Sequence, residues 1–139
     1  MDKYLEILRL MSHVNHRFKN TMRKRTLELG IKDSFRPFMY HICRNEGLSQ
    51  TELVCLLGFK APTVSLTLDQ LESHGYILRK VDDKDQRMIR IYPTSKMLKT
   101  DEMLTKLAIK TSEEFLKDLT EEELEVSKSI LIKIKGDTL

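Results

Sequence analysis

Several residue types that other folds depend on are scarce or missing in this sequence of 139 residues. It has no tryptophan, three prolines, five glycines and two cysteines, Cys43 and Cys55. Two cysteines are too few for a disulfide framework or a zinc ribbon, and they favour a reducing, intracellular compartment. Because glycine and proline are few and no stretch has a biased composition, we expect little disorder and few long loops.

Long apolar runs are also missing. No stretch approaches the roughly 18 apolar residues that span a bilayer, and the first residues lack the basic start and short apolar segment of a signal peptide. We therefore expect a cytoplasmic protein that does not contact a membrane.

Motifs of common enzymes are absent from the sequence. There is no Gly-rich phosphate loop, no HExxH or GxSxG motif and no pair of carboxylates in an apolar frame. We expect neither an enzyme nor a bound cofactor or metal.

What is present fits one globular domain of 16.3 kDa, with 40% hydrophobic and 32% charged residues and a mean hydropathy of −0.37. The net charge of +3 says little about partners, although the basic excess lies in residues 1–29 while residues 95–139 are slightly acidic. Basic residues in the first two thirds either form solvated faces or face a polyanion, and the charge count leaves both open.

Helical periodicity dominates both ends of the chain. An apolar stripe at three- and four-residue steps runs through Tyr4, Leu8, Met11, Val14, Phe18 and Met22, and Gly30 ends the predicted helix. A second helix is predicted from about Ser95 to Lys117, and a third begins at a capping box, Thr120 with Glu123. A small domain has little core to cover such stripes, so residues 1–30 and 95–139 are predicted to form a homodimer.

The middle of the chain predicts three short helices. An amphipathic helix is expected over Ser34 to Asn45, and a second capping box, Ser49 with Glu52, opens a helix that Gly58 ends. Pro62 starts the next helix and Gly75 stops it. Two short helices joined by a Gly-centred turn predict a helix-turn-helix over residues 49–75.

Two β-rich runs follow Gly75, at Tyr76–Val81 and Met88–Tyr92, separated by the polar segment Asp82–Arg87. This pattern predicts a hairpin. The expected fold class is therefore mainly α with a small β-hairpin wing over residues 76–93: a winged helix-turn-helix at residues 31–94, between long terminal helices in a single domain.

The helix from Pro62 to His74 is a candidate reader of DNA. Thr63, Ser65 and Gln70 lie away from its apolar stripe and offer donors and acceptors to base edges, while Ala61 or Leu66 would suit a thymine methyl group. An ordinary amphipathic helix with a polar outer face explains the same pattern equally well.

The hairpin favours DNA. Lys84 and Arg87 supply cations suited to a narrow minor groove, and further cations lie on the flanking strands, at Arg79, Lys80 and Arg90. Three aspartates in one loop make sense if one of them, Asp85, pairs with an arginine and fixes its direction.

Four segments together resemble the MarR family of bacterial transcriptional regulators. They are Leu48–Leu53, Ala61–Ser65, Leu71–Tyr76 and the stretch from Asp85-Gln-Arg87 to Thr94, in the family's order and spacing. The resemblance implies a homodimeric winged helix that represses transcription at a pseudo-palindromic operator in double-stranded DNA. It implies that Arg87 reaches the minor groove and that Asp85 holds the wing. The implied DNA-binding residues are Gln50, Lys60, Ala61, Pro62, Thr63, Ser65, Leu66, Gln70, Lys84, Asp85 and Arg87.

Three departures from the family pattern limit what is carried over. Gln86 replaces a frequent arginine, Leu66 stands where many members have a basic or polar residue, and Ser95-Lys96-Met97 replaces an acidic residue and a glycine. The sequence preference for DNA therefore cannot be transferred.

Family members often bind phenolic or lipophilic effectors between the dimerisation helices and the winged helix, which lowers their affinity for DNA. The resemblance implies such a pocket here, with its lining expected among His13, Arg17, Phe18, Arg36, Phe38, Tyr40 and His41.

Three alternatives stay open. His13, His16 and His41 would suit a metal sensor, although histidines near a dimer seam are more often structural. Cys43 and Cys55, both expected to be buried among apolar neighbours, would have to be exposed to sense oxidants. A winged helix can also serve as a protein-binding module, and a steep loss of affinity with salt would distinguish DNA binding from that role.

Overall fold

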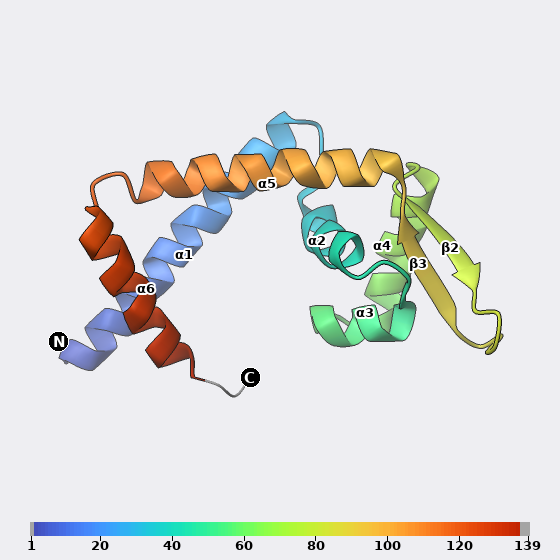
Figure 1. Ribbon diagram of the computed structural model, residues 1–139, viewed down its shortest axis with the longest axis horizontal. Helices are drawn as coiled ribbons and strands as arrows, with labels where there is room; N and C mark the ends of the chain where they lie inside the picture. Colours follow the sequence, from blue (N-terminus) through green and yellow to red (C-terminus); the bar gives the residue numbers. More distant parts are fainter. Residues whose placement is uncertain (1, 137–139) are drawn as a thin grey trace.

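The computed structural model describes residues 2–136 and has two parts joined by one long helix (Figure 1). The elements are α1 (Lys3–Glu28), the 3₁₀ turn η1 (Asp33–Phe35), α2 (Arg36–Arg44), β1 (Leu48–Ser49), α3 (Gln50–Leu57), α4 (Ala61–Ser73), β2 (Ile77–Val81), β3 (Ile89–Pro93), α5 (Ser95–Phe115) and α6 (Glu121–Lys135). The predicted terminal segments 1–30 and 95–139 include residues 1 and 137–139, which lie outside the described residues. The predicted fold class, mainly α with a small β wing, is confirmed.

The long helices α1 and α5 pack against each other where they cross. Two arms extend from this crossing: the N-terminal part of α1 is one, and the end of α5 with α6 is the other. Met22 and Thr26 of α1 are buried, as is Thr111 of α5. Beside them the Arg25 guanidinium donates to Thr111 Oγ1 (2.8 Å) and to the Glu114 carboxylate (2.6 Å). This contact fixes the middle of α1 against the second half of α5.

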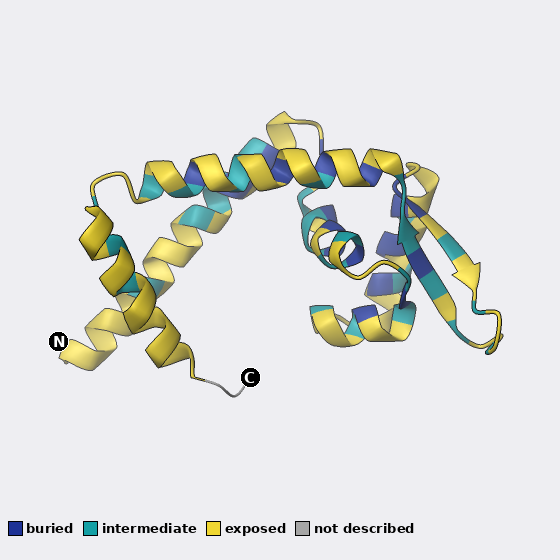
Figure 2. Cartoon of the chain, viewed as in Figure 1, coloured by how far each residue is buried: buried dark blue, intermediate teal, exposed yellow. Residues whose placement is uncertain are grey.

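The core of the molecule lies in the winged-helix part. Buried side chains of α2, α3 and α4 pack with the sheet and with the start of α5, and they are dark blue in Figure 2. Among the most deeply buried are Phe38, Ile42, Leu53, Leu68 and Ile91. In contrast, α6 and the first turns of α1 are mostly exposed.

The sheet has three antiparallel strands in the order β1-β3-β2. The hairpin of β2 and β3 was predicted, whereas β1 was not. Leu48 of β1 pairs with Ile91, and Ser49 pairs with Arg90. The two residues of β1 thus connect the start of the helix-turn-helix to the wing.

Polar caps set several helix boundaries. The Thr120–Glu123 capping box is formed in both directions, as predicted. At α3, Ser49 Oγ accepts from the Glu52 N–H (3.0 Å), but within residues 2–136 the reciprocal bond of the predicted box is not made. Thr94 caps α5, and its hydroxyl lies within hydrogen-bonding distance of the carbonyls of Gly75 (2.7 Å) and Tyr76 (2.9 Å), so the wing is attached directly to the start of α5.

Within residues 2–136, no single helix is both long and apolar enough to cross a membrane. The pair α3 and α4 passes by length and composition together, but the two helices are bent by 115°.

Candidate nucleic-acid interface

The helix-turn-helix presents the N-terminal end of α4 to solvent. Gly58 ends α3 in the left-handed region (φ +70°), and Pro62 lies in the first turn of α4. Val64, Leu68 and Leu71 are fully buried and hold α4 on the core. Lys60, Ala61, Pro62, Thr63 and Leu66 are exposed and Ser65 is half-buried. The predicted reading surface is therefore accessible at the start of the helix.

Gln70, which was grouped with these residues, lies elsewhere. Its Oε1 accepts from Lys32 Nζ (3.1 Å), in the connection between α1 and η1. The Gln70 side chain is therefore already engaged by the protein and faces the α1 side of α4 rather than the wing.

The wing carries an exposed arginine at its end. The Arg87 side chain is 92% exposed, and Asp85 Oδ1 accepts from both its backbone N–H (3.0 Å) and its Nε–H (3.2 Å). The expected pairing of Asp85 with an arginine is thus formed. Lys84 is also exposed on the same loop.

The two arginines on the flanking strands of the wing, Arg79 and Arg90, are not free cations in the structure. Arg79 is only 18% exposed, because its guanidinium donates to Asp69 (2.6 Å) and Glu72 (2.9 Å) of α4. Arg90 donates to Asp82 (2.7 Å) and to the Gly47 carbonyl (2.9 Å). Both charges are compensated within the protein, so Lys84 and Arg87 remain the exposed cations of the loop.

These contacts also change the carboxyl groups. The hydrogen bond from Arg79 holds the pKa of Glu72 below its usual value. The bond from Arg90, followed by the backbone N–H groups of Asp85 and Lys84, lowers the pKa of Asp82 in the same way. Asp69, which would repel phosphates on its own, is compensated by Arg79.

A small hollow of about 290 Å³ connects the wing with the starts of α3 and α4. It is lined by Gln50, Thr51, Val54, Ala61, Arg87 and Ile89. Gln50 and Ala61 of the predicted set thus lie beside Arg87, although they are 37 and 26 positions away in the sequence. Thr51 was not predicted here, and only its place beside Gln50 in the first turn of α3 could have indicated it.

Comparisons with known proteins agree with this geometry. The family model described as the MarR family matches residues 38–89, from α2 to the start of β3. A mutant of MepR from S. aureus is 27% identical with a TM-score of 0.80, over 96% of both chains. A MarR protein from Peptoclostridium difficile is 26% identical with a TM-score of 0.77, over 93% of this chain and 84% of that one. The apo form of wild-type MarR from E. coli is 21% identical with a TM-score of 0.83, over 92% of this chain and 95% of that one.

The segment that the family model matches, residues 38–89, is a MarR-family domain. Members of this family are transcriptional regulators rather than enzymes, and they bind DNA and act as dimers. The MarR-type fold of this chain is therefore that of a DNA-binding regulator.

Within the described residues 2–136, the seven residues expected to line an effector pocket do not form one site. Arg36, Phe38 and Tyr40 lie together in a cavity of about 680 Å³ that also includes Lys19, Phe59, Thr63 and Thr67. The cavity therefore lies between α1, α2 and the recognition helix α4. Within residues 2–136 the Arg36 Nε–H is buried without a hydrogen-bond acceptor, although Arg36 Nη2 pairs with Asp33 (3.1 Å).

The other predicted lining residues are dispersed. Phe18 packs edge-on against Phe115 (centroids 5.6 Å apart), and the Arg17 guanidinium stacks on the same ring (5.2 Å). His13 is exposed on α1, and His41 contacts the Tyr40 ring. Within residues 2–136, these four residues lie outside the cavity that contains Arg36, Phe38 and Tyr40.

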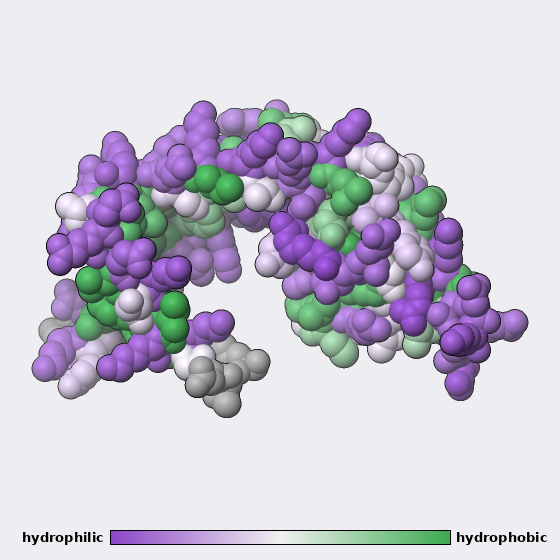
Figure 3. All heavy atoms as spheres, viewed as in Figure 1, coloured by the Kyte–Doolittle hydropathy of each residue, from purple (hydrophilic) through white to green (hydrophobic). Residues whose placement is uncertain are grey.

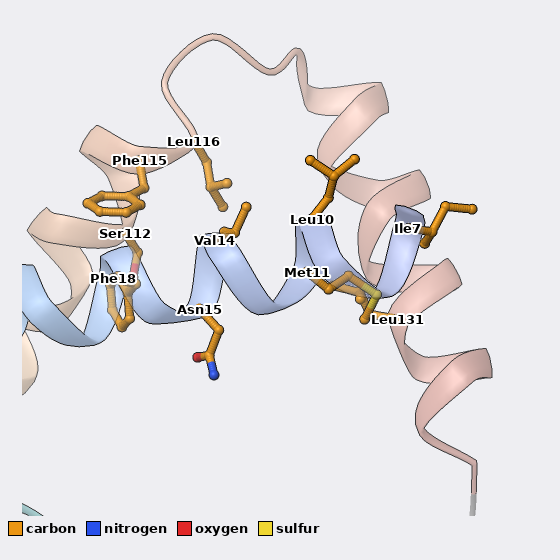
Figure 4. Close-up of a pocket in the computed structure, with 10 residues that line it drawn as sticks. All are labelled: Ile7, Leu10, Met11, Val14, Asn15, Phe18, Ser112, Phe115, Leu116 and Leu131. Carbon is orange, nitrogen blue, oxygen red and sulfur yellow. The ribbon is translucent and has the colours of Figure 1, made fainter. Parts of the chain in front are cut away.

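An apolar groove of about 600 Å³ runs between α1, the end of α5 and α6 (Figure 4). Three residues of the predicted stripe on α1, Met11, Val14 and Phe18, line it. The other apolar lining residues are Ile7 and Leu10 of α1, Phe115 and Leu116 at the end of α5, and Leu131 of α6. Figure 3 shows a hydrophobic patch over α6, the helix that forms one side of this groove.

The structure bears on the alternative hypotheses of a metal sensor and of a thiol sensor. Within residues 2–136, no group of three or more His, Cys, Asp or Glu is placed to hold a metal ion. His16 is within hydrogen-bonding distance of Asn20 (3.0 Å).

Burial and the nearby Asp101 raise the pKa of the half-buried Cys43 to about 11, which disfavours the reactive thiolate. Cys55 is exposed, so the expectation that it is buried was wrong.

Proposed function

We propose that this chain represses transcription as a homodimer that binds a pseudo-palindromic operator and is released by a small-molecule effector. The observation that carries the proposal is the exposed Arg87, held by Asp85 at the end of a wing that lies beside the exposed start of α4. A recognition helix enters the major groove with its N-terminal residues. A wing cation suits the negative potential of an adjacent narrow minor groove.

In this arrangement each residue class has its own role. Thr63, Ser65 and Leu66 would contact base edges, and Gln50, Lys60 and Lys84 would contact phosphates. Gln70 would contribute only if its bond to Lys32 opened. Arg87 would bind in the minor groove at every site, so it would add affinity with little sequence preference.

The apolar groove and the exposed side chains of α1 and α6 support the homodimer. Large apolar side chains are exposed on both arms, including Leu8, Leu10, Val14, Ile130 and Ile132. Contiguous apolar surface of this kind marks an interaction site, and a two-fold partner would cover both arms with the same contacts. Two recognition helices would then read half-sites about 34 Å apart or a multiple of that distance.

The cavity beside α4 supports release by an effector. Phe38 and Phe59 offer apolar walls, and Lys19 offers positive charge. Arg36 is paired with Asp33 of the same lining, but within residues 2–136 its buried Nε–H has no acceptor and is available to a ligand. A phenolic ligand or an aromatic anion would match both features. Because Thr63 and Thr67 of the recognition helix form part of the wall, a bound ligand would shift the helix that reads the operator.

Selection from random duplex DNA at two salt concentrations tests the proposal. We expect an inverted-repeat motif, with an affinity that falls steeply as salt rises because phosphate contacts release counterions. A folded dimer that enriches no motif, or binds DNA with no salt dependence, would contradict the proposal and favour the protein-binding module instead.

Release is tested separately, with a panel of phenols and aromatic carboxylates added to the protein–operator complex. We expect at least one compound to lower operator affinity in the wild type and to lose this effect in Arg36→Gln. A panel without effect on either protein would contradict the effector step while leaving DNA binding intact.

A further inference from the structure

The loop of the wing has no apolar anchor, because residues 82–87 are all polar. Its conformation is instead held by the side chain of Asp82. Asp82 Oδ2 accepts from the backbone N–H groups of Lys84 (3.0 Å) and Asp85 (2.9 Å). Backbone bonds from Asp82 to Met88 (2.8 Å) and from Met88 to Asp85 (3.0 Å) close the loop.

Asp82 is in turn held by Arg90. The Arg90 Nε–H donates to Asp82 Oδ1 (2.7 Å), and its Nη1–H donates to the Gly47 carbonyl (2.9 Å). Gly47 lies in the turn between α2 and β1, and its own N–H donates to the Ile91 carbonyl (2.9 Å). One arginine thus connects the loop to the turn at the end of α2.

The same chain of contacts reaches Arg87. Asp82 holds the backbone of Asp85, and Asp85 Oδ1 accepts from the backbone and the Nε–H of Arg87. A side chain that is 92% exposed would otherwise sample many rotamers. Because the Arg87 side chain is already ordered in the free protein, it loses less conformational entropy when it binds DNA.

We propose that Asp82 and Arg90 are positioning residues, which hold the wing loop on the Gly47 turn so that Arg87 is directed at the minor groove. The proposal rests on the proposed function, in which Arg87 contacts DNA. In this proposal Arg90 acts through Asp82 and Gly47, to which two of its N–H groups donate, and not through a DNA contact of its own.

The test measures operator affinity for Asp82→Ala, alone and combined with Arg87→Ala. Asp82→Ala is expected to weaken binding about threefold to tenfold, the effect of one side chain that must be ordered on binding. Combined with Arg87→Ala, it should cause no further loss, because Asp82 acts through Arg87. An equal loss in both backgrounds, or no loss in the wild-type background, would overturn the proposal.

Asp83→Ala is the matched control. Asp83 is an exposed neighbour in the same loop, and its substitution removes the same charge. The electrostatic gain from deleting a carboxylate near phosphates is therefore read from this variant and subtracted. Thermal unfolding of each variant shows whether the winged helix remains folded.

A second measurement uses the protein without DNA and tests two milder variants. In the free protein, ¹⁵N relaxation at the Arg87 Nε should report an ordered side chain, and Asp82→Asn or Arg90→Met should increase its mobility. Unchanged mobility would overturn the proposal. Failure of the wild type to bind any duplex would instead contradict the proposed function, so the two failures are distinguishable.

Discussion

Arg79, Arg87 and Arg90 carry the same charge on one hairpin but differ in what their guanidinium groups contact. Arg79 bonds two carboxylates of α4, and Arg90 bonds Asp82 and a backbone carbonyl. Within residues 2–136, the Arg87 guanidinium is held through its Nε alone, by Asp85 two positions earlier, and extends into solvent. At the scale of single residues, the hairpin therefore contains two structural arginines and one that remains available to a ligand.

Arg87→Ala should weaken binding at all DNA sequences by about tenfold and reduce the slope of log affinity against log salt by about 1. The reason is the loss of one cation from the DNA surface. Titration of labelled duplexes at several salt concentrations measures both quantities. Lys106→Ala is the control, since it removes an exposed cation from α5, far along the chain from the wing. A slope equal to that of the wild type would exclude a DNA contact by Arg87.

Arg79→Ala should lower the free energy of unfolding by about 1 kcal/mol, because it leaves Asp69 and Glu72 without their shared partner. Arg79 lowers the pKa of Glu72. This contribution to stability is therefore present above the usual pKa of a glutamate and is lost as pH falls through the lowered value. Denaturant unfolding at neutral pH and at acidic pH should show a difference between the two proteins that shrinks in acid.

The sequence predicted Arg87 and Asp85 because their pairing is local, two residues apart. It could not separate Arg79 and Arg90 from the DNA-facing cations, since their partners lie 10 residues away at Asp69 and 43 residues away at Gly47. Cys55 was misjudged for a related reason. Apolar neighbours in sequence do not define a buried face on a helix of eight residues, on which only Leu53 is fully buried.

At the scale of elements, turns decide how the short helices and the wing meet. The helices and the hairpin were predicted because their periodicity extends over five or more residues. The strand β1 was not, because two residues show no alternation and Ser49 also signals a helix cap. Its pairing with β3 depends on the turn at Gly47, which has a φ of +83°.

Gly58→Ala and Gly47→Ala form a matched pair, since both glycines have left-handed backbones. Gly58→Ala should cost about 1 kcal/mol from conformation alone, because within the described residues its Cβ would enter open space. Gly47→Ala should cost more, because its Cβ would lie 3.3 Å from the Tyr92 ring. Chemical denaturation measures both values. Equal costs would show that the Tyr92 ring moves aside freely.

At the scale of the whole molecule, the winged helix has its own core, whereas α6 and the first turns of α1 leave apolar side chains exposed. The stripe on α1 predicted a dimer from the sequence, since no core of this size could cover it. The position of the proposed effector pocket was less predictable, because it depends on how α1 crosses α5 and on the distance that this crossing sets between His13 and α2.

Val14→Asp tests the role of the arms. A carboxylate in the apolar groove should dissociate the proposed dimer, because a buried unpaired charge is costly. Sedimentation equilibrium should then find a monomer that retains a folded winged helix and binds a full operator much more weakly. For the oligomeric state, Leu78→Asp on β2 is the control, since Leu78 has the same 53% exposure as Val14 but lies outside the arms. A dimeric Val14→Asp protein would show that the interface lies elsewhere.

The helix α5 is capped at its start by Thr94, which holds the wing, and ends at Phe115, which packs on α1. Its 21 residues make a rigid rod about 30 Å long. In such a lever, a tilt of about 10° at the arm end moves the wing end by about 5 Å, which exceeds the 3.4 Å step between neighbouring base pairs. A change too small to disturb the packing of the arms would therefore be enough to put the two wings out of register with their operator.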